Sequence, residues 1–185
     1  MSKIAKIIID ILLVIVCVVG AYFLSNWLFM TIPVAGTSMT DTVLDGDNVI
    51  LYKQGKYRYG DIVVFNTHVQ TEEGESHYIK RIIAFPGDTV EIKKDGGAYF
   101  IFVNDVKLDE EYLGGDIRAR ESDAHEKRVV PEGCFYFCGD NRLNSLDSRS
   151  GMYGEIDSIL GRVILKYDAD DGFLNDLTTV KRVKA

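Results

Sequence analysis

Near the middle of the chain lies the segment Tyr78-Ile79-Lys80-Arg81-Ile82-Ile83-Ala84-Phe85-Pro86-Gly87-Asp88. Its β-branched and aromatic residues predict a β-strand, and the Pro-Gly pair predicts a turn that ends the strand. Side chains alternate between the two faces of a strand, so Lys80 and Arg81 are expected to point in opposite directions. If the face that carries Tyr78, Lys80 and Ile82 is covered, the Lys80 amine loses its water. A desolvated lysine tends to give up its proton and can then act as a base.

A candidate nucleophile precedes this strand, in Ala35-Gly36-Thr37-Ser38-Met39, which follows a long apolar segment. A serine hydroxyl needs a nearby base to become a nucleophile, so Ser38 and Lys80 together indicate a Ser–Lys hydrolase. Taken singly, each residue also has a structural interpretation. Ser38 could be a turn residue or a helix cap, and Lys80 could extend its amine into solvent.

The apolar segment before Ser38 predicts a membrane anchor. Residues 11–30 include no charged residue, and as a helix they would span roughly 30 Å, the thickness of the hydrocarbon core of a bilayer. Lys3 and Lys6 precede the segment, so the positive-inside rule places the N-terminus in the cytoplasm and everything after Thr31 outside. A cleaved signal peptide and a buried helix of a soluble protein are the alternatives. The apolar run is longer than the usual signal-peptide core of about 7–15 residues.

Composition narrows the class of protein. The 185 residues suffice for one membrane anchor and one modest domain. A formal net charge of −7, without a basic stripe, argues against nucleic acid as a partner. With 46% hydrophobic residues and only 3 prolines, the chain is expected to fold rather than to remain disordered.

Neither a disulfide nor a metal site is expected. Cys17 lies inside the apolar segment, where it would act as a small apolar filler. Cys134 and Cys138 flank an aromatic run that predicts a strand. Four positions along a strand separate the Cα atoms by roughly 13 Å, which is too far for a bridge. The histidines show no metal-ligand spacing; they are His68, His77 and His125.

After the apolar segment the chain is predicted to be mostly β. Short segments rich in β-branched and aromatic residues alternate with Asp-Gly, Gly-Asp and Pro-Gly turn signals. The predicted strands are 48–52, 61–66, 78–85, 89–93, 98–103, 134–138 and 162–167. Asn104-Asp105 predicts a hairpin turn between 98–103 and 106–108. The charged stretch 109–128, which contains Gly114-Gly115, is expected to be a solvated loop. The tail 168–185 is expected to hold a short helix or to fray.

Four blocks of sequence occur in one order behind the apolar segment. They are Gly36-Thr37-Ser38-Met39-Thr40-Asp41-Thr42, Gly60-Asp61-Ile62-Val63-Val64-Phe65, the segment from Tyr78 to Asp88, and Gly139-Asp140-Asn141-Arg142-Leu143-Asn144-Ser145-Leu146-Asp147-Ser148-Arg149. With these blocks the chain resembles the bacterial type I signal peptidases, membrane-bound enzymes that remove signal peptides from exported proteins. The resemblance extends from the apolar segment to about Tyr167.

The resemblance implies a mechanism at the matching positions. Ser38 matches the nucleophile and Lys80 matches the general base. Ser145 would hydrogen-bond the Lys80 amine and orient it. Asp147 and Arg149 would pair with each other and hold this part of the chain in place.

The resemblance also implies how the substrate is held. The N–H of Ser38 would donate to the oxyanion. Gly36 stands where some relatives carry a serine whose hydroxyl is a second donor, so the oxyanion hole here would depend on main-chain amides or on water. Met39, Tyr78 and Ile79 match family positions near the pockets for the residues one and three before the cut. Shallow apolar pockets there would accept Ala or Gly.

Two other positions depart from the family pattern. Asp41 stands where many relatives have proline. A residue other than proline would loosen the turn after Ser38 without removing a catalytic group. Leu143 occupies a place in the last block that is often polar, and no effect is predicted for it.

The implied fold is mostly β, with a single N-terminal transmembrane helix followed by an extracytoplasmic β-sheet catalytic domain that carries a small β insertion. The expected parts are a cytoplasmic N-terminus (1–10), a transmembrane helix (11–30), a catalytic core (31–88 and 132–167), the insertion (89–131) and a C-terminal tail (168–185). The implied activity is cleavage of exported preproteins after small residues, at sites of the Ala-x-Ala type, through an acyl-enzyme. No cofactor is implied. The implied partners are preprotein signal peptides, membrane lipid and, by proximity, the protein export machinery.

Two other functions are left open by the sequence. A catalytically silent, membrane-tethered β-domain that binds peptides or partners would share this fold, and a cleavage assay distinguishes it. A self-cleaving Ser–Lys regulator of the repressor type would carry a DNA-binding or partner segment at its N-terminus, where a membrane span is expected here.

Overall fold

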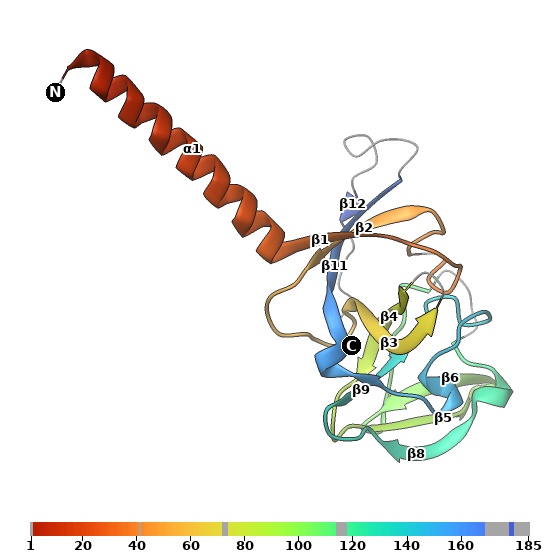
Figure 1. The fold of residues 1–185 in the computed structure, drawn as a ribbon. Helices are drawn as coiled ribbons and strands as arrows, with labels where there is room; N and C mark the ends of the chain where they lie inside the picture. The colour runs from red at the N-terminus through yellow and green to blue at the C-terminus, as the bar shows by residue number, and fades with distance from the viewer. Residues whose placement is uncertain (1, 41, 72–73, 114–117, 169–177, 180–185) are drawn as a thin grey trace.

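The computed structural model describes residues 2–40, 42–71, 74–113, 118–168 and 178–179. A long helix, α1 (Lys3–Leu28), projects from a body built of β-strands (Figure 1). Predictions that concern Asp41, Gly114-Gly115 and most of the tail 168–185 lie outside the described residues. The strands are β1 (Phe29–Pro33), β2 (Asp47–Tyr52), β3 (Ile62–Thr71), β4 (Gly74–Ala84), β5 (Thr89–Asp95), β6 (Ala98–Val103), β7 (Val106–Lys107), β8 (His125–Val129), β9 (Cys134–Cys138), β10 (Gly154–Glu155), β11 (Ile159–Asp168) and β12 (Thr178–Thr179), and the short 3₁₀ helices are η1 (Glu121–Asp123), η2 (Ser148–Ser150) and η3 (Ile156–Ser158).

Helix α1 is long and apolar enough, by length and composition, to cross a membrane, and none of it is buried against the body. It begins earlier than the predicted span, at Lys3, where the Ser2 hydroxyl accepts a hydrogen bond from the N–H of Ala5. It ends at Leu28 rather than at Met30. The chain leaves the helix there because the next residues pair with β2 as strand β1.

The end of α1 is fixed to the body without a flexible linker. The backbone N–H of Lys53 donates to the carbonyl of Leu28 at 2.8 Å, and the Lys53 amine donates to the carbonyl of Asn26 at 2.7 Å. These bonds satisfy carbonyls that have no partner within the last turn of a helix. A cation at this end also complements the helix dipole.

The strands form two antiparallel sheets. Among the described residues, the large sheet has the order β1-β2-β11-β3-β4-β9-β10, with β12 pairing with β11, and the small sheet has the order β7-β6-β5-β8. Strand β4 lies inside the large sheet. Its Lys80 is opposite Val63 of β3, and its Arg81 is opposite Cys138 of β9. The alternation along β4 therefore directs two neighbouring cations to different surroundings.

An aromatic cluster holds β3, β4 and β9 together. The ring of Phe65 lies edge-on to those of Phe135 and Phe137, with centroids 5.1 and 5.0 Å apart. Ile82 of β4 belongs to the same cluster and is completely buried. This packing fixes β4 two residues beyond Lys80.

The structure confirms the mostly β fold behind one N-terminal helix, and each of the seven predicted strands overlaps an observed one. The predicted hairpin turn is also confirmed. Asn104 and Asp105 have φ angles of 51° and 68°, in the left-handed region that tight hairpin turns need. The cysteines Cys17, Cys134 and Cys138 are free thiols.

The prediction of a solvated loop over 109–128 is wrong for much of that stretch. Helix η1 and most of strand β8 fall inside it, and the side chains of Glu110, Leu113 and Asp123 are buried. The charged composition suggested exposure. Both carboxylates are buried because arginines distant in sequence pair with them, Arg142 with Glu110 and Arg149 with Asp123.

Candidate active site

Ser38 and Lys80 meet beside β4, just before the point at which that strand pairs with β9. The Lys80 amine, on β4, donates a hydrogen bond to the Ser38 hydroxyl, which lies in the loop between β1 and β2. Lys80 is only 4% exposed. The ring of Tyr78, two residues earlier on the same face of β4, has its centroid 5.2 Å from the Lys80 nitrogen. The strand alternation thus buries the amine beside an aromatic ring and the serine.

The surroundings of Lys80 favour its neutral form. Burial lowers the pKa of Lys80 from its ordinary value of 10.5 to about 8, and the positive charge of Arg149 acts in the same direction. The carboxylates of Asp147 and Asp140 oppose this change, but the loss of hydration outweighs them. With a pKa of about 8, roughly a tenth of the Lys80 amine is neutral and able to accept a proton at pH 7.

The loop that bears Ser38 is held by the block 139–149. The N–H of Asn141 donates to the carbonyl of Ser38 at 3.0 Å, and its side-chain amide donates to the carbonyl of Thr37 at 3.0 Å. The Asn144 amide donates to the Thr37 hydroxyl at 3.0 Å. Gly139 has no room for a side chain, because a Cβ there would overlap the Ser38 carbonyl and the Ser145 side chain. The two segments therefore pack main chain against main chain.

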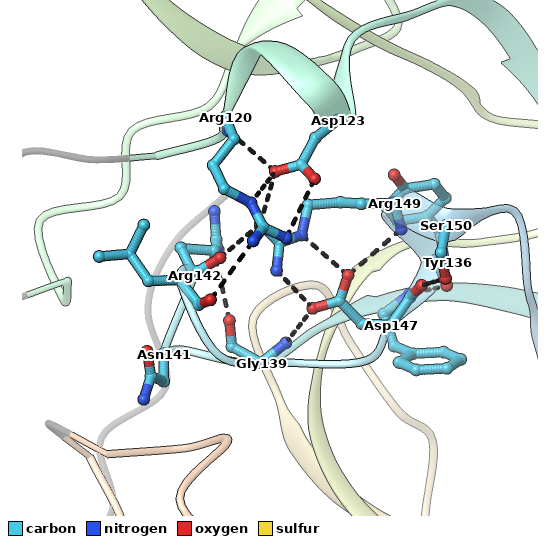
Figure 2. A network of polar contacts seen from close by, with 12 residues as sticks. Arg120, Asp123, Tyr136, Gly139, Asn141, Arg142, Asp147, Arg149 and Ser150 are labelled. Atoms are coloured by element: carbon cyan, nitrogen blue, oxygen red, sulfur yellow. Dashed lines mark hydrogen bonds and ion pairs between the residues drawn. The ribbon is translucent and has the colours of Figure 1, made fainter.

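Asp147 and Arg149 form a buried ion pair inside the same block (Figure 2). Arg149 donates from Nε to one Asp147 oxygen at 2.8 Å and from Nη2 to the other at 3.0 Å. The N–H of Gly139 donates to the Asp147 carboxylate at 3.0 Å. Although burial alone would raise it, the pKa of Asp147 is lowered by these hydrogen bonds and by the Arg149 charge.

Ser145 lies in the same block but does not make the expected bond to Lys80. Its hydroxyl is buried and has no hydrogen-bond partner among the described residues. It lies near enough to Asp147 to contribute to the lowered pKa of that carboxyl. A buried hydroxyl without a hydrogen-bond partner is unfavourable. The Ser145 hydroxyl is therefore suited to form a hydrogen bond with the Lys80 amine, or with a bound ligand, after a small movement.

The candidate oxyanion donors differ in availability. The N–H of Gly36 donates to the Asp45 carboxylate at 2.7 Å, so it is already engaged. The N–H of Ser38 makes no hydrogen bond within the part of the chain that the structure describes. Gly36 has a φ of 105°, which a side chain rarely adopts, and it sets the path of the loop into Ser38.

A groove of about 990 Å³ opens at Ser38 and Lys80. One wall is formed by β1 and the residues that follow it, and the other by residues 76–80 of β4, which include Tyr78 and Ile79. Both walls are free sheet edges among the described strands, since β1 pairs only with β2, and β4 meets β9 only from Arg81 onward. Met39, in contrast, does not line the groove: it is completely buried, and its sulfur accepts from the N–H of Asp140.

Other residues of the site were not singled out from the sequence. Arg81 pairs with Asp140 at 2.8 and 2.6 Å, and the Thr42 hydroxyl donates to the same carboxylate at 2.6 Å. Leu146 lines the groove although it is exposed. The sequence did indicate that Arg81 would have an acidic partner such as Asp140, because a cation inside an apolar strand needs a buried anion. No group of three or more His, Cys, Asp or Glu suited to a metal ion occurs among the described residues.

The sequence profile of the family described as "Signal peptidase, peptidase S26" matches residues 5–167. The chain belongs to the signal peptidase family. The signal peptidase I of Bacillus licheniformis is 36% identical over 151 residues, which cover 75% of this chain and 76% of that protein. The signal peptidase I S of Bacillus subtilis (strain 168) is 34% identical over 150 residues, with 75% and 76% covered. A crystal structure of a signal peptidase I from Enterococcus faecalis V583 is 27% identical, with a TM-score of 0.43, and covers 58% of this chain and 97% of that one.

Membership of this family makes the chain a serine peptidase. Its matched region includes most of α1, so the apolar helix is part of the family's architecture here and fits a membrane anchor. The groove, the serine and the buried lysine occupy one place on the body of this signal peptidase family member.

The Asp147–Arg149 pair is expected to be essential for stability. Asp147→Ala should lower the free energy of unfolding by about 3–5 kcal/mol, because it leaves the Arg149 guanidinium buried next to fewer anions. Urea denaturation of the detergent-solubilised chain, followed by circular dichroism, measures this change. Asp95→Ala is the control, since Asp95 forms an exposed pair with Lys107 and its loss should change the value by less than about 1 kcal/mol. Equal stability of the two variants would contradict the expectation.

Proposed function

We propose that the chain cleaves signal peptides from exported preproteins, with Ser38 as the nucleophile and Lys80 as the general base. The observation that carries the proposal is the hydrogen bond between the two side chains at a site where Lys80 is almost fully buried. A neutral amine in contact with a hydroxyl is the arrangement that general-base activation of a serine requires.

In the proposed reaction the Ser38 oxygen attacks the scissile carbonyl carbon while its proton passes to the Lys80 nitrogen. The oxyanion that forms accepts a hydrogen bond from the N–H of Ser38. Collapse of this intermediate breaks the peptide bond, and Lys80 gives its proton to the leaving amine. The acyl ester on Ser38 is then hydrolysed by a water that Lys80 deprotonates, and the proton returns to Ser38 as the ester bond breaks.

The groove suggests how a signal peptide is held. An extended peptide could lie between the free edges of β1 and β4 and pair with main-chain groups of both, which is β-strand addition. Its scissile bond would then lie at Ser38, beside Lys80. Tyr78 and Ile79 on one wall would limit the size of neighbouring side chains, which agrees with a preference for sites of the Ala-x-Ala type.

The supporting residues have distinct proposed roles. Asp147 and Arg149 hold the block that packs on the Ser38 loop, and Ser145 supplies a buried hydroxyl that can bond the Lys80 amine after a small movement. The Ser38 N–H is the proposed main oxyanion donor. Gly36 contributes conformation rather than a bond, because its N–H is held by Asp45.

We further propose the orientation and the division of the chain. Residues 1–10 would lie in the cytoplasm, and the membrane-spanning part of α1 would run from Ile11 to Leu28, because Phe29 and Met30 belong to β1. The catalytic core (31–88 and 132–167), the insertion (89–131) and the tail (168–185) would lie outside the cytoplasm. Because β1 follows α1 directly and lines the groove, the anchor would hold the groove close to membrane lipid, near signal peptides delivered by the export machinery.

The test is processing of a preprotein with an Ala-x-Ala site by the full chain in detergent. Ser38→Ala and Lys80→Ala should each reduce the rate by more than about 10³-fold, and the double variant should be no slower than either, because the two residues act as one unit. Circular dichroism checks that the variants remain folded. Substantial cleavage by either single variant would sink the dyad, and a wild-type chain that binds but never cleaves would favour the silent β-domain.

The pH dependence of the rate should follow Lys80. Only its neutral form can accept the Ser38 proton, so kcat/KM on a soluble peptide should rise with pH and level off above a midpoint of about 8. Since the unfolded chain holds this proton up to its ordinary value of 10.5, the contribution of Lys80 to the free energy of unfolding should increase from about pH 8 to that value. It should be constant below about pH 8. A rate that is flat from pH 6 to 9.5, or that falls throughout, would exclude Lys80 as the base.

A further inference from the structure

Two buried carboxylates in the stretch that connects β7 and β8 bind arginines of the block 139–149. Glu110 is 2% exposed and Asp123 is 8% exposed. Glu110 accepts two hydrogen bonds from Arg142, at 2.9 and 2.6 Å. Asp123 accepts one from Arg149 at 2.9 Å. Figure 2 shows the Arg149 guanidinium between Asp123, on the turn of η1, and Asp147, on the catalytic block.

Each arginine also binds the main chain of the block itself. Arg142 donates from Nε to the carbonyl of Gly139, in the block, at 3.0 Å. Its Nη1 donates to the carbonyl of Arg118, in the stretch between β7 and β8, at 2.9 Å. Arg149 donates from Nη1 to the carbonyl of Arg142 at 2.8 Å. Both guanidinium groups therefore connect the block 139–149 to the stretch between β7 and β8. The carboxylates of Glu110 and Asp123 hold the guanidinium groups in place.

The opposite side of the block bears on the reacting residues. The N–H of Asn141 holds the Ser38 carbonyl, and the N–H of Gly139 holds the Asp147 carboxylate. A continuous set of hydrogen bonds thus runs from Glu110 through Arg142 to Gly139, and from Asp123 through Arg149 to Asp147. One end lies in the stretch between β7 and β8, which are strands of the small sheet, and the other end follows β9 of the large sheet.

We propose that Glu110 and Asp123 are positioning residues for peptide cleavage, which fix the block 139–149 so that Ser38 and Asp147 keep their places beside Lys80. The inference rests on the proposed function, since it concerns the efficiency of the same dyad. The stretch between β7 and β8 then belongs to the active site although none of its described residues lines the groove. A small displacement of a reacting group, of about 1 Å, is enough to lower a rate up to about 10²-fold.

The test compares kcat, KM and melting temperature of full-chain variants on a soluble Ala-x-Ala peptide, well below each melting temperature. Glu110→Gln should lower kcat by about 10-fold or more and change KM by less than about 3-fold, because the groove walls are left intact. Asp123→Asn can still accept the hydrogen bond that Asp123 takes from the N–H of Arg120 at the start of η1, so it should lower kcat by a smaller factor, about 3-fold. Asp95→Asn removes the carboxylate of an exposed pair in the small sheet and should leave all three quantities unchanged.

A double variant separates positioning from stability. Glu110→Gln combined with Arg142→Met leaves no unpaired buried charge, so the melting temperature should recover toward that of the wild type. The low kcat should persist, because the bond from Arg142 to Gly139 is then lost. If Glu110→Gln does not fold, the double variant and Asp123→Asn carry the test.

A wild-type kcat in folded Glu110→Gln, or in the double variant and Asp123→Asn, would overturn the inference. So would recovery of kcat together with melting temperature in the double variant. These outcomes leave the proposed function intact. Cleavage that persists in Ser38→Ala would instead overturn the proposed function.

Discussion

A lysine amine in water carries a proton at neutral pH, with a pKa of about 10.4, and a protonated amine cannot take a proton from a serine. The proposed chemistry of this chain therefore depends on removing water from Lys80 without supplying a compensating anion in direct contact. Strand β4 does this by placing Lys80 on the face that carries Tyr78 and Ile82, while Arg81 turns to its own carboxylate, Asp140. The only side-chain hydrogen bond described for the Lys80 amine goes to Ser38.

Burying a neutral amine next to charged groups requires those charges to be balanced elsewhere. Three buried arginines lie around the site, and each has an anion: Arg81 with Asp140, Arg142 with Glu110, and Arg149 with Asp147 and Asp123. The Arg81–Asp140 pair connects the block 139–149 to β4. The pairs of Arg142 with Glu110 and of Arg149 with Asp123 connect the same block to the stretch between β7 and β8. In such an arrangement the removal of one partner is far more harmful than the replacement of both, because a lone buried charge has no water. The groove is lined by β1, by residues 76–80 of β4 and by Ser38, so the residues proposed to transfer the proton lie in the wall of the proposed peptide site.

Much of this fold could be predicted from the sequence because its signals are local. β-branched and aromatic runs between Gly, Pro and Asp turns located the seven predicted strands, and an uncharged run located the helix. Strand β1 was missed because Phe29–Pro33 continues the apolar run of α1, and only pairing with β2 shows where the helix ends. Strand β8 was missed because His125–Val129 is charged and reads as a surface loop until it pairs with β5.

The candidate site also combines residues that could be predicted from local motifs with residues that could not. Ser38, Lys80 and the block 139–149 were found because they occur in ordered motifs. Glu110 and Asp123 were not, since a buried carboxylate and an exposed one look alike in sequence, and their arginines lie 32 and 26 positions away. The engagement of the Gly36 N–H by Asp45 depends on the path of the loop between β1 and β2, and the burial of Met39 depends on its contact with Asp140, 101 positions away.

The most direct test of the account is the pKa of Lys80 itself, measured apart from catalysis. The full chain labelled with ¹⁵N-lysine, in detergent micelles, can be titrated while the Nζ resonance of Lys80 is followed, with Lys80→Arg identifying the signal. The account predicts a transition at about 8, well below the ordinary lysine value of 10.5. A Lys80 transition at the ordinary lysine value of 10.5 would contradict it, because the amine would then be protonated throughout the range in which it is proposed to act.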